Sequence, residues 1–307
     1  MNMAKRYNDF NTYLRDIFGC RVQKITIDAG FSCPNRDGTI TTGGCIYCND
    51  RGSGSGARAR GFSITEQIIQ GKRALSKRYK AKKFIAYFQS FSNTYAPTSQ
   101  LKSLYEEALA VDDVVGLSIG TRPDCVDEPV LALLQEYSTN SLIWIEYGLQ
   151  SAHDTTLAFI NRGHDFKCFV QAVDATRNRG IKICAHVILG LPHESKNHML
   201  ATADAIAGLR IDGIKLHLLY VIQGTRLADL YGQGAYKCLE QQEYIDLVCE
   251  FLERIPQDMV VQRLTGDPHP QELVAPIWSL KKMETIALIQ ATLDARDSWQ
   301  GKFATQV

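Results

Sequence analysis

Apolar and polar residues follow two alternating patterns along most of the chain. Runs of alternating or continuous apolar residues predict strands at 22–28, 83–89, 114–120, 141–149, 181–189 and 212–219. Between them, apolar residues recur at helical spacing, which predicts helices at 63–80, 98–110, 127–137, 153–160 with 166–179, 195–208 and 225–231. Strands separated by helices indicate repeated βα units and a parallel sheet, either open or closed into a barrel of fewer than eight units.

Residues 236–307 do not continue this alternation. Their pattern predicts a helix at 240–254, a strand at 259–265, a turn-rich segment at 266–271 and a long helix at 277–298. We therefore divide the chain into a lead-in at 1–21, a βα core at 22–235 and a small α/β extension at 236–307. Because the extension follows the core, we expect it to close the side of the core or the mouth of its site.

The composition is that of a folded protein without a membrane span. Of the 307 residues, 45% are hydrophobic and 22% are charged, which excludes wholesale disorder, collagen and coiled coil. No run of 18 apolar residues is present, and the first residues lack the apolar stretch of a signal peptide. We expect a cytoplasmic protein with no membrane partner.

Charge is balanced over the whole chain but not along it. The formal net charge is +1, yet residues 51–83 contain ten basic residues and one acidic residue, so that this basic window carries a net charge of +9. Its first part, 51–61, is rich in glycine, and its second part, 71–83, has seven basic residues and no acidic one. Such a window is either a solvated helix face or a surface for a polyanion.

Three of the nine cysteines are grouped between the first predicted strand and the first predicted helix. Cys33, Cys45 and Cys48 form a C-x11-C-x2-C arrangement among glycine and turn residues, so the loop can fold tightly around a bound ion. Three thiolates suit an iron–sulfur cluster with one open iron, whereas structural zinc prefers four ligands. Cys20 could supply a fourth ligand, so zinc stays an alternative, as does a plain core role.

Four further segments resemble those of the radical S-adenosylmethionine (SAM) superfamily and occur in the same order. They are TRPD at 121–124, EYGLQS at 146–151, INRGHD at 160–165 and HVILGLPHES at 186–195. The resemblance is to the elongator and coproporphyrinogen-oxidase-like branch, and within it to the bacterial YhcC-like proteins, and it covers essentially the whole chain. One departure is that many members have Gly-Gly-Glu at the end of the second strand, where this chain has YFQSFSNTYAP at 87–97.

The resemblance implies a partial (β/α)6 TIM-like barrel that binds a 4Fe–4S cluster and SAM. Cys33, Cys45 and Cys48 would ligate the cluster, whose open iron would bind the amino and carboxylate groups of SAM. Arg162 matches the arginine that pairs with the SAM carboxylate. Gln89 is the substitute candidate for the missing glutamate. The residues that we expect to bind the cofactors are Tyr47, Gln89, Glu146, Gln150, Arg162 and Gly190.

Polar residues at same-face positions of the predicted strands indicate a polar interior. In such a barrel, the chemistry gathers at the carboxyl ends of the strands, and alternate residues face inward. His186 on the fifth strand, and Lys215 and His217 on the sixth, are therefore candidates for substrate contact. Because unpaired buried polar groups are costly, such a set across several strands favours a ligand site.

The resemblance implies a radical SAM enzyme, in which the reduced cluster cleaves SAM to a 5′-deoxyadenosyl radical that abstracts hydrogen from a substrate. Relatives in the elongator branch act on wobble uridines of tRNA, and together with the basic window this favours tRNA modification. The implied partners are a low-potential electron donor, such as flavodoxin or ferredoxin, and tRNA. Two alternatives stay open: a radical SAM enzyme acting on a small metabolite or a protein, and a non-catalytic, metal-stabilised protein that binds nucleic acid.

Overall fold

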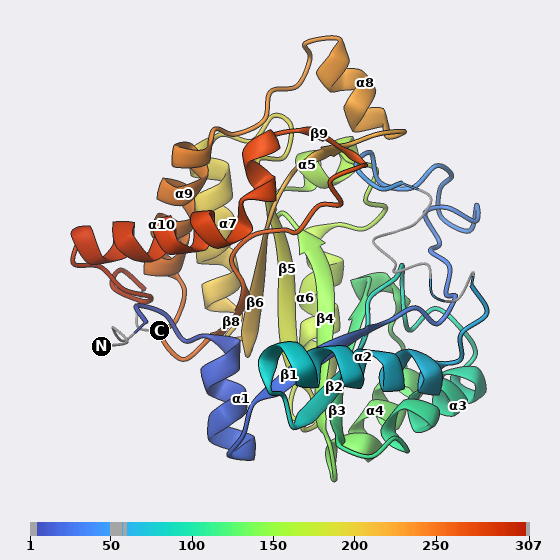
Figure 1. Ribbon diagram of the computed structural model, residues 1–307. Coiled ribbons are helices and arrows are strands. Elements are labelled where there is room, and N and C mark those ends of the chain that lie inside the picture. The colour runs from blue at the N-terminus through green and yellow to red at the C-terminus, as the bar shows by residue number, and fades with distance from the viewer. Residues whose placement is uncertain (1–4, 50–56, 58–59, 305–307) are drawn as a thin grey trace.

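A curved parallel sheet is the centre of the molecule (Figure 1). The computed structural model describes residues 5–49, 57 and 60–304. Within these residues, the main sheet has seven strands in the order β1-β2-β3-β4-β5-β6-β8. They are β1 Val22–Ile27, β2 Lys83–Phe88, β3 Val114–Thr121, β4 Leu142–Gln150, β5 Lys182–Leu189, β6 Gly213–Leu218 and β8 Val260–Arg263. The strand order follows the chain order, as expected for successive right-handed βα units.

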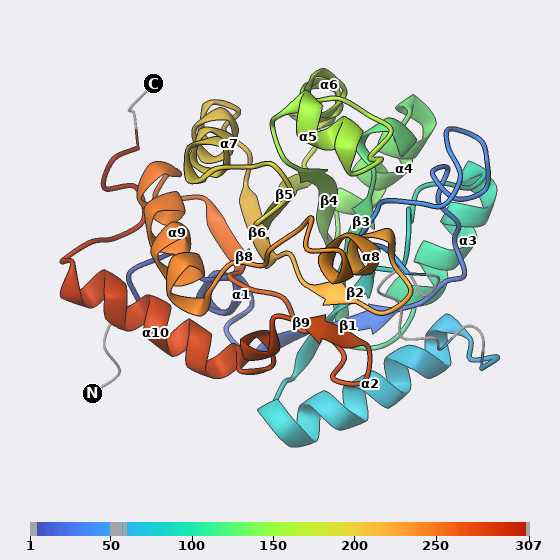
Figure 2. The same ribbon diagram turned by 90° about the horizontal axis from the view of Figure 1, so that it is seen from above.

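The connecting helices cover the outer face of this sheet, as seen along the barrel in Figure 2. They are α2 Ile64–Tyr79, α3 Thr98–Leu109, α4 Glu128–Ser138, α5 Asp154–Phe159, α6 Phe166–Thr176 and α7 Lys196–Gly208. A continuous apolar core lies between the two layers. For example, Phe88 on β2 packs edge-on against Tyr105 on α3, with ring centroids 5.1 Å apart. The predicted partial (β/α)6 barrel is confirmed.

Helix α1 (Phe10–Phe18) lies at the amino ends of the strands, in the segment that the sequence pattern assigned only to a lead-in. Asp9 caps its start by accepting from two backbone N–H groups, and Gly19 ends it with a φ of 65°. Phe10 and Tyr13 contact Trp144 edge-on at 5.8 and 5.7 Å. The helix therefore closes the bottom of the barrel with an aromatic cluster.

The C-terminal extension packs against the barrel and contributes a strand to the main sheet. Its strand β8 pairs in parallel with β6, and α9 (Gln241–Arg254) packs between α7 and α10 (Lys282–Ala295). The predicted long helix at 277–298 is wrong at its start, because a short 3-10 turn at Ile277–Leu280 ends at Lys281, whose φ of −92° and ψ of 48° are not helical. The divisions at 21/22 and 235/236 stay predictions, although β8 shares the sheet of the core.

A small lid lies over the carboxyl ends of the strands. Strand β7 (Val221–Ile222) pairs antiparallel with β9 (Leu273–Ala275), and helix α8 (Arg226–Gly232) follows β7. Both views show α8 and β9 at this end of the barrel (Figures 1 and 2). No helix among the described residues is both long and apolar enough to span a bilayer.

Candidate active site

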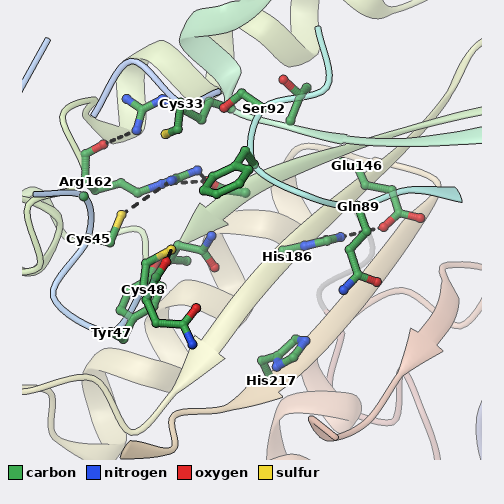
Figure 3. Close-up of a pocket in the computed structure, with 18 of the residues that line it drawn as sticks. Cys33, Cys45, Tyr47, Cys48, Gln89, Ser92, Glu146, Arg162, His186 and His217 are labelled. Atoms are coloured by element: carbon green, nitrogen blue, oxygen red, sulfur yellow. Dashed lines mark hydrogen bonds and ion pairs between the residues drawn. The ribbon is translucent and has the colours of Figure 1, made fainter. Parts of the chain in front are cut away.

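A cavity of about 620 Å³ opens at the carboxyl ends of the strands. The cysteine loop, residues 33–49 between β1 and α2, forms one side of the cavity (Figure 3). Inward-facing residues of β4, β5, β6 and β8 form the other side. The structure brings ten of the twelve predicted site residues to this wall. They are Cys33, Cys45, Tyr47, Cys48, Gln89, Glu146, Gln150, Arg162, His186 and His217.

The other two predicted residues do not reach the cavity wall. Lys215 lies behind it, fully enclosed, with Nζ 3.0 Å from the Tyr87 hydroxyl. The Gly190 N–H donates to Met199 Sδ, and its carbonyl accepts from the Tyr236 hydroxyl. Both backbone polar groups of Gly190 are thus hydrogen-bonded within the protein, under the lid.

Tight turns shape the cysteine loop. The Arg36 N–H donates to the Cys33 carbonyl at 2.8 Å, and the Cys48 N–H donates to the Cys45 carbonyl at 2.9 Å. Between these turns, the Gly44 N–H donates to the Asn35 carbonyl at 2.8 Å. The loop therefore folds back on itself, as the glycine and turn residues predict, and turns all three thiols toward one end of the cavity.

Asn35 connects this loop to the INRGHD segment at 160–165. Its amide nitrogen donates to the carbonyls of Asn161 and Arg162 at 2.6 and 2.8 Å. Gly163, with a φ of 75°, makes this approach possible, because a Cβ there would lie 2.4 Å from Asn35 Oδ1. Two motifs that lie more than a hundred residues apart in the sequence thus form one unit.

Arg162 lies beside the thiols with its side chain buried. Its Nε and Nη2 donate to the Gly148 carbonyl at 3.2 and 2.7 Å, and Nη1 lies 3.7 Å from Cys45 Sγ. Burial opposes the charged guanidinium, but the Cys45 sulfur raises the pKa of Arg162, so the charge is kept. Gly148 leaves the room for it, since a Cβ there would lie 2.6 Å from Arg162 Nη2.

The thiol set fits an iron–sulfur cluster better than a zinc ion. Within the described residues, no three His, Cys, Asp or Glu side chains converge as ligands of one metal ion. In a 4Fe–4S cluster each cysteine ligates a different iron, so three thiols along one end of a cavity are sufficient. Cys20 lies before β1, at the opposite end of that strand from the loop. Arg162 and Asn35 direct N–H groups at Cys45 Sγ, the arrangement that outer partners of a metal-ligating sulfur adopt.

Glu146 on β4 is fully buried at the centre of a polar network inside the sheet. Its carboxylate accepts from the ammonium groups of Lys24 and Lys215 and from the Ser118 hydroxyl. It also lies 2.7 Å from His186 Nε2. Burial opposes ionisation, but the charges of Lys215 and Lys24 hold the pKa of Glu146 well below its ordinary value. The network therefore contains one carboxylate, the buried Lys215 and the half-buried Lys24.

Burial lowers the pKa values of two bases in this network, Lys215 and His186. Burial lowers the pKa of Lys215 to about 7, despite the opposing charge of Glu146. Burial, together with the Lys215 charge, lowers the pKa of His186 to about 4, so His186 is neutral near pH 7. A neutral imidazole donates its Nε2–H to Glu146, as Figure 3 shows by a dashed line.

Three residues that shape this site are not found by the sequence reasoning. Lys24 stands on β1 and reaches Glu146 on β4, and the alternation of side chains along a strand is the signal that could place it on the inner face. For Asn35, the sequence pattern indicates only a role in a turn. Arg263 lies in the extension, and nothing in the local pattern places its strand beside β6.

Comparison with known proteins defines the class. The sequence profile of the Radical SAM superfamily matches residues 37–206, and that of the radical SAM C-terminal domain matches residues 211–295. The chain therefore belongs to the radical SAM superfamily, and it is a radical SAM enzyme. Membership of this family implies a 4Fe–4S cluster and SAM as cofactors and the need for a reductant.

Individual relatives agree with this class. The chain is 44% identical to YtqA of Bacillus subtilis, over 98% of this chain and 94% of that protein. It is 39% identical to YhcC of Escherichia coli, over 91% and 89% of the two chains. Among solved structures, Elp3 of Methanocaldococcus infernus has a TM-score of 0.70 at 17% identity, over 91% of this chain and 64% of that one, which shows a shared fold. The predicted likeness to YhcC-like proteins is confirmed.

Proposed function

We propose that Cys33, Cys45 and Cys48 hold the 4Fe–4S cluster and that this enzyme modifies tRNA. The observation that carries the cluster assignment is that all three thiols line one end of a polar cavity, with the Arg162 guanidinium fixed beside Cys45. When bound, the cluster and SAM supply a 5′-deoxyadenosyl radical that removes hydrogen from the substrate.

The residues of the chain position and enclose the reactants. Arg162 offers a planar cation next to the thiols, which suits the carboxylate of SAM. Gln89 and Gln150 line the same cavity and provide amide groups for the remaining polar atoms of the cofactor. Holding the reactants inside the barrel brings the substrate C–H close to the radical and keeps water away.

The support for tRNA is the resemblance to the elongator branch and the charge of α2. Lys77, Arg78 and Lys80 are exposed at the end of this helix. The earlier part of the basic window, 51–56 and 58–59, lies outside the described residues. Since α2 runs back along the barrel for about 24 Å, its basic end lies away from the cavity mouth. It would contact the body of a large polyanion rather than the reacting base.

The test of the cluster is anaerobic reconstitution followed by assay of iron, sulfide and 5′-deoxyadenosine with dithionite and SAM. We expect about four irons per chain and reductive cleavage of SAM. Cys45→Ala should lose the cluster and stay folded, whereas Cys168→Ala, at a cysteine away from the cavity, should keep it. Full iron in Cys45→Ala would refute its role as a ligand.

The test of the substrate is the dependence of 5′-deoxyadenosine formation on unmodified tRNA. Reversal of Lys77, Arg78 and Lys80 to Glu should weaken tRNA binding by at least tenfold and lower its salt dependence. A control with the same charge change on other exposed lysines, Lys167, Lys196 and Lys237, should bind as the wild type does. Equal binding by both triple variants would reject α2 as an RNA surface, and no effect of tRNA on turnover would reject RNA as the substrate.

A further inference from the structure

The cavity wall opposite the cysteine loop, taken together with the polar network directly behind it, carries more positive than negative charge. His186, Lys215 and Arg263 lie next to one another across β5, β6 and β8. Lys24 reaches the same network from β1, and Glu146 is the carboxylate that it shares with Lys215. Two lysines behind the wall thus already share one carboxylate, and Arg263 adds a further cation on the wall itself.

Arg263 has no acidic partner in the described part of the chain. Its Nη1 lies 2.6 Å from His217 Nε2, and this is its one hydrogen bond there. Burial and the charge of Arg263 lower the pKa of His217 well below its ordinary value, so the ring is neutral and accepts at Nε2. Within the described residues, no carboxylate therefore compensates the charge of this guanidinium, and both residues line the cavity.

The acidic residues at the cavity mouth have partners of their own. Asp267 pairs with Lys282 at 3.0 Å, and Glu272 Oε2 accepts from the Asn49 amide at 3.1 Å. Neither of them neutralises Arg263. A guanidinium with unused N–H groups, facing a cavity of this size, is the arrangement that binds carboxylates and phosphates in a bidentate manner.

We propose that Arg263, together with His217, binds an anionic group of the substrate, a carboxylate or a phosphate, on the wall opposite the cysteine loop. The proposal rests on the proposed function, because it places the substrate in the cavity that the cluster would face. It adds to that function that the substrate has an anionic group within reach of Arg263. The substrate is then held at its anionic end by Arg263 of the C-terminal extension and His217 of β6. Its reacting C–H points across the cavity toward the thiols.

The experiment measures anion binding without turnover. Protein with reconstituted, oxidised cluster is labelled with ¹³C-histidine, and the His217 ring signal is assigned with His217→Gln. Inorganic phosphate and acetate are titrated separately, with chloride replaced so that ionic strength stays constant. We expect a saturable shift of the His217 signal with at least one anion, and a loss of affinity of at least tenfold in Arg263→Gln. Arg254→Gln, at an arginine on α9 outside the cavity, should behave as the wild type.

Each outcome bears on the proposal. Saturation with phosphate alone identifies a phosphate, and saturation with acetate alone identifies a carboxylate. If Arg263→Gln does not fold, Arg263→Lys keeps the charge but loses the planar fork, and it should weaken binding severalfold. No saturable shift with either anion, or equal affinity in the wild type and in the Arg263 variant that folds, overturns the proposal. The anion titration contains no reductant and does not depend on SAM cleavage. Failure of SAM cleavage in the separate assay would therefore reject the proposed function without changing the anion-binding result.

Discussion

The position of Arg162 depends on the absence of a side chain at Gly148. A Cβ at residue 148 would lie 2.6 Å from Arg162 Nη2 and 2.8 Å from Gln150 Nε2, closer than real contacts allow. Both side chains line the cavity, so both would have to move away from the thiols.

We therefore predict that Gly148→Ala weakens SAM binding about tenfold, which corresponds to about 1.4 kcal/mol. The measurement is equilibrium dialysis of SAM against the reconstituted protein. Gly208→Ala at the end of α7 is the matched control, because a Cβ there meets no atom within 4 Å. Unchanged affinity in Gly148→Ala would show that the guanidinium does not contact SAM.

His186 should make the fold sensitive to acid. Its pKa is lowered to about 4 in the folded state by burial and by the Lys215 charge, against an ordinary value of 6.5. The unfolded chain therefore takes up the proton first, so stability is complete above pH 6.5 and falls as the pH drops toward 4. The two values correspond to a loss of about 3 kcal/mol at most.

The prediction is that His186→Asn flattens the dependence of the unfolding free energy on pH between 6.5 and 4. Urea denaturation at a series of pH values checks this, with the exposed His193→Gln as control. A slope in His186→Asn as steep as in the wild type would assign the acid sensitivity to other groups, such as Glu146, whose own contribution is lost at lower pH.

At the scale of elements, α1 stabilises the barrel from below. Leu14 is 1% exposed in a cluster with Val22 of β1 and Ile85 of β2, whereas Ile17 on the same helix is 49% exposed. We predict that Leu14→Ala lowers the free energy of unfolding by about 2–5 kcal/mol and Ile17→Ala by less than about 1 kcal/mol. Urea denaturation checks both variants, and equal effects would mean that α1 is not docked as described.

How well each element could be predicted follows from how local its signal is. The six βα units repeat a strong periodicity, and the predicted strands at 22–28 and 181–189 agree with β1 and β5. Helix α1 has a local signal of this kind, because its apolar residues at helical spacing are followed by the stop residue Gly19. The break at Lys281 has no such signal, since it depends on backbone angles within a helix-like sequence.

How well each residue of the site could be predicted also depends on how local its signal is. The three cysteines lie within sixteen residues, so their spacing alone points to a metal site. Glu146, His186 and His217 could be placed on inward faces by strand alternation. The pairing of β8 with β6, which brings Arg263 to the cavity, is a long-range contact that periodicity does not encode.

At the scale of the whole molecule, the extension is part of the barrel. Strand β8 completes the sheet, and α9 buries Tyr244, Val248 and Phe251 completely. We predict that a chain ending at residue 239 does not fold, because it would expose the edge of β6 and the apolar face of α7. Circular dichroism and size-exclusion chromatography check this, and a monomeric fragment with a cooperative melting transition would contradict it.

The distance in sequence between the two walls of the cavity sets an order of events during synthesis. Cys48 precedes Arg263 by 215 positions, which at about 5–20 residues per second is a delay of roughly 10–40 s. During this interval the thiols have left the ribosome while β8 is still missing from the sheet. The cysteine loop would therefore be accessible to iron and sulfur delivery before the far wall exists, and the cavity would be completed around it.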